Sequence, residues 1–130
     1  MMKLTQVKGN TWVVEAMALI PFYKLDDRRV ILLDTGLQQV YISLGSDGLY
    51  AADRQGHSVR LPCPKVQVAN ATGGGDAMAA ALAACIAHGR PLAECARMAA
   101  GAGALACTAS ETIHPGMSWE SIEYIVNTAK

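Results

Sequence analysis

The chain has 130 residues with eleven basic and eleven acidic side chains, so its formal net charge is zero, and 52% of its residues are hydrophobic. This length predicts one domain over 1–130, and the balanced charge argues against nucleic acid as a partner. The longest apolar runs, 77–87 and 98–107, are too short to cross a bilayer, and the N-terminus lacks the apolar core of a signal peptide. We therefore expect a cytoplasmic protein with no membrane partner.

The first third of the chain mixes strand and helix signals. Residues 4–8 alternate between apolar and polar types as in a short strand. Residues 11–19 are mostly apolar and predict a helix or a distorted turn, which Pro21 ends. A second helix is expected over 26–35, because its acidic start suits the positive end of a helix dipole and Gly36 suits its C-terminal cap.

The middle of the chain has the pattern of a β-hairpin followed by a third strand. Residues 39–44 and 49–52 alternate as strands, and the glycine-containing turn 45–48 separates them. A further turn at 53–56 leads to a short strand over 58–61. The strands that precede the helical half of the chain predict a layered α/β fold.

A glycine turn then joins a predicted strand over 65–68 to a predicted helix over 76–87. The turn reads Asn70-Ala71-Thr72-Gly73-Gly74-Gly75-Asp76. Glycines permit the bend and leave the first N–H groups of the helix uncovered, which makes a site for an anion. Asp76 is placed to take a proton from a hydroxyl that attacks a bound phosphate. The alternative is that Asp76 is only the N-cap of its helix.

The rest of the chain is predicted to be helical. A helix over 91–108 contains Gly101 and Gly103, which each cost about 1 kcal/mol relative to alanine. Either a neighbouring helix or a flat ligand such as an adenine ring must approach these glycines closely. Ser118 is a suitable N-cap for a last helix that ends at Thr128.

The cysteines and histidines have structural interpretations. The four cysteines form no Cys-x-x-Cys pair, and three of them, Cys85, Cys95 and Cys107, lie in alanine-rich segments, where we expect reduced core thiols. The histidines show no zinc-ligand spacing with the cysteines. His88 is expected over the C-terminal carbonyls of its helix.

The glycine turn resembles the second signature of the PfkB/ribokinase family of sugar and nucleoside kinases. That signature usually reads Asp/Asn-x-Thr-Gly-Ala-Gly-Asp, so Gly74 stands where alanine is usual. Residues 43–48 resemble the family's turn beside the nucleotide phosphates, and 99–108 resemble its adenine-side wall. Residues 61–64 and 70–84 are most similar to members of the pseudouridine kinase type.

The resemblance implies a ribokinase-like α/β fold, of which residues 4–128 would form the C-terminal, nucleotide-binding half: a short sheet and hairpin packed with helices. It implies Asp76 as the general base and the N–H groups of Gly73, Gly74 and Gly75 as the anion hole. It places the nucleotide against Gly45, Ser46, Thr72, Ala100, Gly103 and Cys107, with Gly45 and Ser46 at the phosphates and the last three on the adenine side. ATP, Mg²⁺ and K⁺ are the implied cofactors, with K⁺ near Asn70 and Thr72.

The sequence departs from the family at the implied magnesium site. An Asn-x-x-Glu motif organises Mg²⁺ in the family, and Asn10 is present, but Val13 occupies the glutamate position and has no oxygen ligand for a hard cation. Glu15 supplies the carboxylate only in another register. The metal candidates are therefore Asn10, Glu15 and Asn70.

Two functions stay open, because the first signature and the sugar-binding strands and lid of the family have no counterpart in this sequence, which therefore resembles a truncated kinase domain. One is ATP-dependent phosphoryl transfer to a sugar or nucleoside hydroxyl. The other is a non-catalytic nucleotide-binding or dimerising remnant. A separate chain that supplies the other half is a further possibility. A half sheet leaves an unpaired edge and an apolar patch, so we expect a homo-oligomer.

Overall fold

The computed structural model describes residues 3–8, 11–15, 19–26, 29–32 and 38–129. The chain divides into two compact units, Met1–Leu37 and Gln38–Lys130, and each is described by itself. Whether 1–130 acts as one domain stays a prediction.

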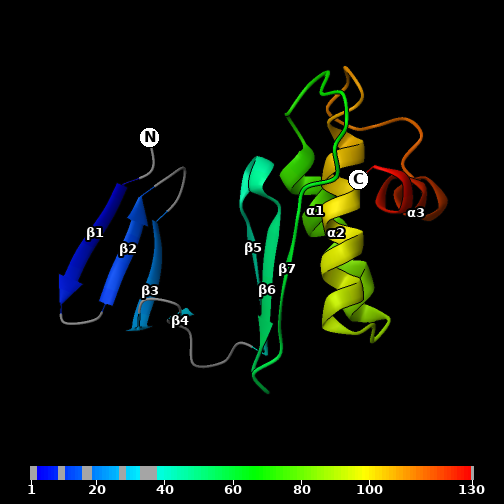
Figure 1. Ribbon diagram of the computed structural model, residues 1–130. Helices are drawn as coiled ribbons and strands as arrows, with labels where there is room; N and C mark the ends of the chain where they lie inside the picture. The colour runs from blue at the N-terminus through cyan, green and yellow to red at the C-terminus, as the bar shows by residue number, and fades with distance from the viewer. Residues whose placement is uncertain (1–2, 9–10, 16–18, 27–28, 33–37, 130) are drawn as a thin grey trace. The chain divides into compact units, whose positions relative to one another are not determined.

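The first unit contains a four-stranded antiparallel sheet in the order β1-β2-β3-β4 (Figure 1). Its strands are β1 (Lys3–Lys8), β2 (Thr11–Glu15), β3 (Leu19–Asp26) and β4 (Arg29–Leu32). The strand predicted over 4–8 is confirmed. The helix or distorted turn predicted over 11–19 and the helix predicted over 26–35 are wrong, since the described parts of both are strands. Valine, isoleucine and tryptophan in β2 and β4 fit a pleated sheet better than a helix, and this preference outweighs the acidic helix-start signal.

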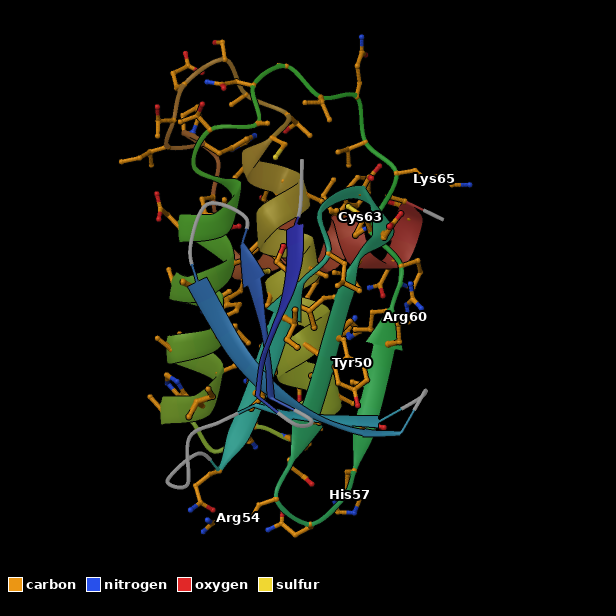
Figure 2. All side chains as sticks on the ribbon, turned by 90° about the vertical axis from the view of Figure 1, so that its left-hand side faces the viewer. Tyr50, Arg54, His57, Arg60, Cys63 and Lys65 are labelled. Atoms are coloured by element: carbon orange, nitrogen blue, oxygen red, sulfur yellow. The ribbon has the colours of Figure 1, made fainter. Side chains whose placement is uncertain are left out.

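The second unit begins with a three-stranded antiparallel sheet that confirms the predicted hairpin and the strand after it. Its strands are β5 (Gln39–Ser43), β6 (Leu49–Asp53) and β7 (Ser58–Leu61), and a 3₁₀ turn, Gly45–Asp47, joins β5 to β6. Ala51 pairs with Tyr41 on one side and with Val59 on the other, and Ala51 is fully buried on the face that the helices cover. The next residue pair, Tyr50 and Arg60, lies on the opposite face (Figure 2).

Three helices lie on one side of this sheet (Figure 1). They are α1 (Gly74–Ala87), α2 (Leu92–Ala106) and α3 (Trp119–Thr128). α2 packs on β6 and β7 and also contacts α1 and α3. The predicted cap of α3 is confirmed, because the Ser118 hydroxyl accepts the Ser121 N–H at 3.1 Å. Within the described residues, no helix is long and apolar enough to cross a membrane.

The core of the second unit has two parts, both built around α2. Between α2 and the sheet lie Leu49, Ala51, Leu92, Ala96 and Ala99. Between the helices lie Ala81, Cys85, Cys95, Met98, Ala102, Leu105 and Ile122. The small side chains allow the helices to approach closely, so the alanine-rich composition of this half is a consequence of packing.

The thiols and His88 largely follow the sequence interpretation. All four cysteines are free, and Cys85 and Cys95 are buried as predicted. Cys107 is only half-buried, so it is not a core thiol. His88 Nδ1 lies 2.7 Å from the Ala84 carbonyl oxygen, which confirms its predicted position at the helix end. The described part of the chain contains no group of three or more His, Cys, Asp or Glu side chains suited to hold a metal ion.

The segment between β7 and α1 differs from the prediction. Residues 65–68 are not a strand and have no regular structure. Prolines 62 and 64 fix an extended backbone ahead of them, and the next two N–H groups, of Ala69 and Asn70, bond to the Cys107 carbonyl oxygen instead of a neighbouring strand. α1 also begins two residues before the expected Asp76, at Gly74.

Gly101 in α2 marks a close approach of α3. A Cβ atom at Gly101 would lie 2.4 Å from Val126 Cγ2 and 3.0 Å from Ile122 Cγ2. We expect Gly101→Ala to lower the free energy of unfolding by about 1–3 kcal/mol, because overpacking outweighs the better helix propensity of alanine. Urea unfolding of the two chains measures the difference. An equal or higher midpoint for the variant would show that α3 moves aside freely.

Candidate functional site

A cleft of about 520 Å³ lies within the second unit, where the turn after β5, the segment after β7, the start of α1 and the C-terminal half of α2 meet. Its volume is in the range of small-molecule sites. It is lined by Ser43, Gly45, Ser46, Gly48, Leu49, Cys63, Pro64, Lys65, Val66, Val68, Ala71, Gly74, Gly75, Met78, Ala100, Gly103, Ala104 and Cys107.

The glycine turn borders this cleft at the start of α1. Gly73 precedes the helix with a φ of +89°, a left-handed conformation that favours glycine. Gly74 and Gly75 are the first helical residues, and both line the cleft. Ala77 is the donor of the first intrahelical bond, to the Gly73 carbonyl oxygen. The N–H groups before it therefore have no partner in the helix, and they lie at the positive helix end, where an anion is favoured.

Asp76 lies in the first turn of α1 and is exposed. It does not cap the helix, because Gly73 is the cap residue and makes no side-chain capping bond. The interpretation of Asp76 as only an N-cap is therefore wrong. Asp76 does not itself line the cleft, but it follows directly on Gly74 and Gly75, which do.

The turn after β5 and the face of α2 form the other predicted walls. Gly45 and Ser46, predicted at the phosphates, line the cleft, as do Ala100, Gly103 and Cys107, predicted on the adenine side. Gly103 also lies against the start of α1, since a Cβ atom there would be 3.2 Å from the Gly74 carbonyl oxygen. Gly103 thus lets α1 pack closely on α2 and also leaves part of the cleft wall without a side chain. Gly101 instead lets α3 pack closely on α2.

Asn70, Thr72 and Gly73 lie outside the cleft lining and support the turn. The Asn70 side-chain amide donates to the Ser110 carbonyl oxygen at 2.9 Å, and its oxygen accepts the Thr72 N–H at 2.9 Å. Gly73 packs against the Thr112 carbonyl oxygen, which would lie 2.2 Å from an added Cβ. The loop after α2 therefore holds the turn in place.

Sequence reasoning missed the wall formed by the segment after β7. Among the lining residues of the described chain, Lys65 is the one that carries a charge. Figure 2 shows Cys63 and Lys65 on the segment that leaves β7, with the Lys65 side chain extending away from the ribbon. Burial, followed by the neighbouring Cys107 thiol, raises the pKa of Cys63 above its usual value. A lone lysine after Pro64 gives no sequence signal, so only the fold reveals this wall.

The structure has a bent glycine turn at a helix N-terminus that borders a cleft, in an α/β fold, and this arrangement is typical of proteins that bind anionic ligands. Residues 15–119 match the family model of the pfkB family carbohydrate kinases, and the chain belongs to this family. It is 38% identical over 95 residues to the pseudouridine kinase of Escherichia coli (strain K12), an alignment that covers 73% of this chain and 30% of that one.

Solved structures confirm the ribokinase-like fold. Arabidopsis thaliana ribokinase, complexed with ribose and ATP, superposes with a TM-score of 0.61 at 30% identity, over 70% of this chain and 30% of that one. Phosphofructokinase-2 of Escherichia coli, in complex with potassium, superposes with a TM-score of 0.62 at 26% identity, over 69% and 28% of the two chains. The chain therefore spans about a third or less of the length of each of these relatives.

The described residues test neither of the two implied metal sites. Asn10 lies outside the described residues and Glu15 lies in β2 of the first unit, so the magnesium site stays a prediction. For K⁺, the Ser110 carbonyl oxygen already accepts the Asn70 amide, and the Asn70 oxygen already accepts the Thr72 N–H. Each of these oxygens keeps a second lone pair, so the K⁺ site near Asn70 and Thr72 also stays a prediction.

Proposed function

We propose that the cleft binds ATP and that the chain forms the nucleotide-binding part of a kinase for a sugar or nucleoside hydroxyl. The observation that carries this proposal is the position of Gly74 and Gly75, whose N–H groups begin α1 at the wall of the cleft. The helix dipole and these donors favour a phosphate group. Lys65 adds a positive side chain to the same cleft.

The other walls suit the remaining parts of a nucleotide. Ala100, Gly103 and Ala104 present small apolar groups along α2, and Met78 adds an apolar side chain from α1. A flat base gains from removing such surface from water. Gly45, with a φ of +61°, has nothing within 4 Å of an added Cβ, so the backbone of its turn is open to a ligand.

In the proposed transfer, the acceptor's hydroxyl oxygen attacks the γ-phosphorus, and the bond from that phosphorus to the oxygen of the departing ADP breaks. Asp76 accepts the proton of the hydroxyl, while the glycine N–H groups stabilise the charge on the transferred group. Mg²⁺ supplies further neutralisation of the phosphates when bound. Since Asp76 is exposed and is not the helix cap, its carboxylate is available for this role.

A non-catalytic nucleotide-binding protein is the second candidate. One observation favours it: Val13 stands where the family motif has a glutamate. Both candidates share the nucleotide cleft and differ in the transfer step.

Calorimetric titration of the purified chain with ADP, followed by phosphorus NMR of ATP mixed with pseudouridine, ribose or fructose 6-phosphate, separates the two. We expect ADP to bind. Transfer to any acceptor supports the kinase, and binding without transfer supports the non-catalytic protein. A folded chain that binds no nucleotide would overturn both.

We also propose that the chain forms a homo-oligomer. β5 and β7 are the two edges of the sheet in the second unit. β5 carries no charged residue and no proline, and edges without such protection tend to pair with another strand. Sedimentation velocity should show a species larger than 13.7 kDa, and a monodisperse monomer would contradict this proposal.

A further inference from the structure

Lys65 is a cation in the wall of the cleft, and none of the described residues forms an ion pair with it. It lies in the segment after β7, and it is exposed. Arg90 differs, because it is paired with Glu94. Figure 2 shows the Lys65 side chain extended away from the ribbon. The ammonium group is therefore available to a ligand.

The cleft contains no other charged side chain among its described lining residues, and in particular no carboxylate. The remaining lining side chains with donor groups are the hydroxyls of Ser43 and Ser46 and the thiols of Cys63 and Cys107. The positive charge of Lys65 is thus not neutralised within the lining, and the positive end of the α1 dipole adds to it. Such a cleft favours an anionic ligand over a neutral one.

Lys65 and the start of α1 belong to different walls of the cleft. The segment with Lys65 is held against the turn after β5, because a Cβ atom at Gly48 would lie 2.8 Å from the backbone nitrogen of Cys63. The start of α1 is held against α2, because a Cβ atom at Gly74 would lie 3.0 Å from Cys107 Sγ. An anionic ligand can therefore meet backbone N–H groups on one wall and an ammonium group on another.

We infer that Lys65 is a specificity-determining residue that recognises the phosphate chain of a nucleoside diphosphate or triphosphate. Linked phosphates present several anionic oxygens, so they can contact the helix start and the ammonium group together, and each contact is a charge-assisted hydrogen bond. A lysine suits this role, because it is a compact charge on a flexible stem. The inference rests on the proposed nucleotide-binding function.

Two substitutions of Lys65 separate its charge from its packing. Lys65→Met gives a side chain of similar length without the charge, and Lys65→Arg keeps the charge. Arg60→Met is the matched control, because Arg60 is also exposed, lies on β7 and does not line the cleft. It removes the same charge from the chain. Both positions are exposed, so we expect the unfolding midpoints of all three variants to match that of the wild type.

Calorimetric titrations of the full chain and its variants use ADP, adenosine and inorganic tripolyphosphate as probes. We expect Lys65→Met to weaken ADP and tripolyphosphate roughly three- to tenfold, as for the loss of one charge-assisted hydrogen bond, and to leave adenosine unchanged. The loss should shrink in concentrated potassium chloride, because salt screens exposed charges. Lys65→Arg and Arg60→Met should match the wild type with every probe.

Three results would each overturn the inference. They are an ADP affinity of Lys65→Met equal to that of the wild type, an equal loss for adenosine, and an equal loss in Arg60→Met. The first of these, with ADP bound by the wild type, leaves the proposed function standing. A wild type that binds tripolyphosphate but not ADP, with weaker tripolyphosphate binding by Lys65→Met, would reject the proposed function and leave the role of Lys65 standing. A folded chain that binds neither probe would overturn both.

Discussion

Asp76→Asn should lower phosphoryl transfer by about 10²–10⁴-fold and leave ADP affinity close to that of the wild type. Asparagine keeps the size of the side chain but cannot accept the hydroxyl proton. The N–H groups of Gly74 and Gly75, which we propose to bind the phosphates, are unchanged by the substitution. Initial rates of ADP formation with a saturating acceptor, together with calorimetric ADP titration, measure the two effects.

Glu123→Gln is the matched control for this prediction. Glu123 is also an exposed helical carboxylate, but it lies on α3 and does not line the cleft, and its substitution changes the net charge equally. It should retain the wild-type rate. Because Asp76 also interacts with the α1 dipole, its loss should lower stability by about 0.3–1 kcal/mol. A variant that unfolds normally and retains the wild-type rate would remove Asp76 from the mechanism.

Local signals in the second unit were sufficient to predict most of its elements. The β5–β6 hairpin follows from alternation around a glycine turn, and the α3 cap follows from Ser118 alone. These features depend on residues a few positions apart, so the sequence displays their cause directly. Residues 65–68 alternate in the same way, but they pair with none of the described strands, and pairing is a property of the whole fold.

The first unit shows the opposite case, in which two local signals conflict. In 26–35 an acidic start favours a helix, whereas Val30, Ile31 and Leu32 favour a strand. Pairing of β4 with β3 decides for the strand. No property of the segment alone could show that β3 would lie beside it.

In the candidate site, too, features set by neighbouring residues were predicted, and features set by distant residues were not. The glycine turn was predicted from its own residues, but the support of the turn was not, since it comes from Ser110 and Thr112. Asn70 was predicted as a metal ligand because of its residue type. That role stays a prediction, and the structure adds hydrogen bonds at both ends of its side chain, one of them across forty residues of sequence. Lys65 was missed because no local pattern distinguishes it from a surface lysine.

Gly73→Ala should remove nucleotide binding and destabilise the chain. At a φ of +89° an alanine is strained by about 1–3 kcal/mol. Its Cβ would also lie 2.2 Å from the Thr112 carbonyl oxygen, a backbone atom that cannot turn aside as a side chain can. The turn would have to separate from the 107–112 loop, and the N–H groups of Gly74 and Gly75 would move with it. Urea unfolding and ADP titration follow the two consequences.

Gly75→Ala provides the comparison, because it adds the same methyl group two residues further along. Gly75 has helical backbone geometry, and nothing lies within 4 Å of an added Cβ. Alanine there should stabilise α1 by about 0.5–1 kcal/mol through helix propensity. The free energy of unfolding should rise whether or not ADP binding changes. Weaker ADP binding by this variant would show that the methyl group blocks the cleft that Gly75 lines. Equal stability of the two variants would mean that the bend at Gly73 is not held by the loop, and the site would then lack the fixed geometry on which phosphate binding depends.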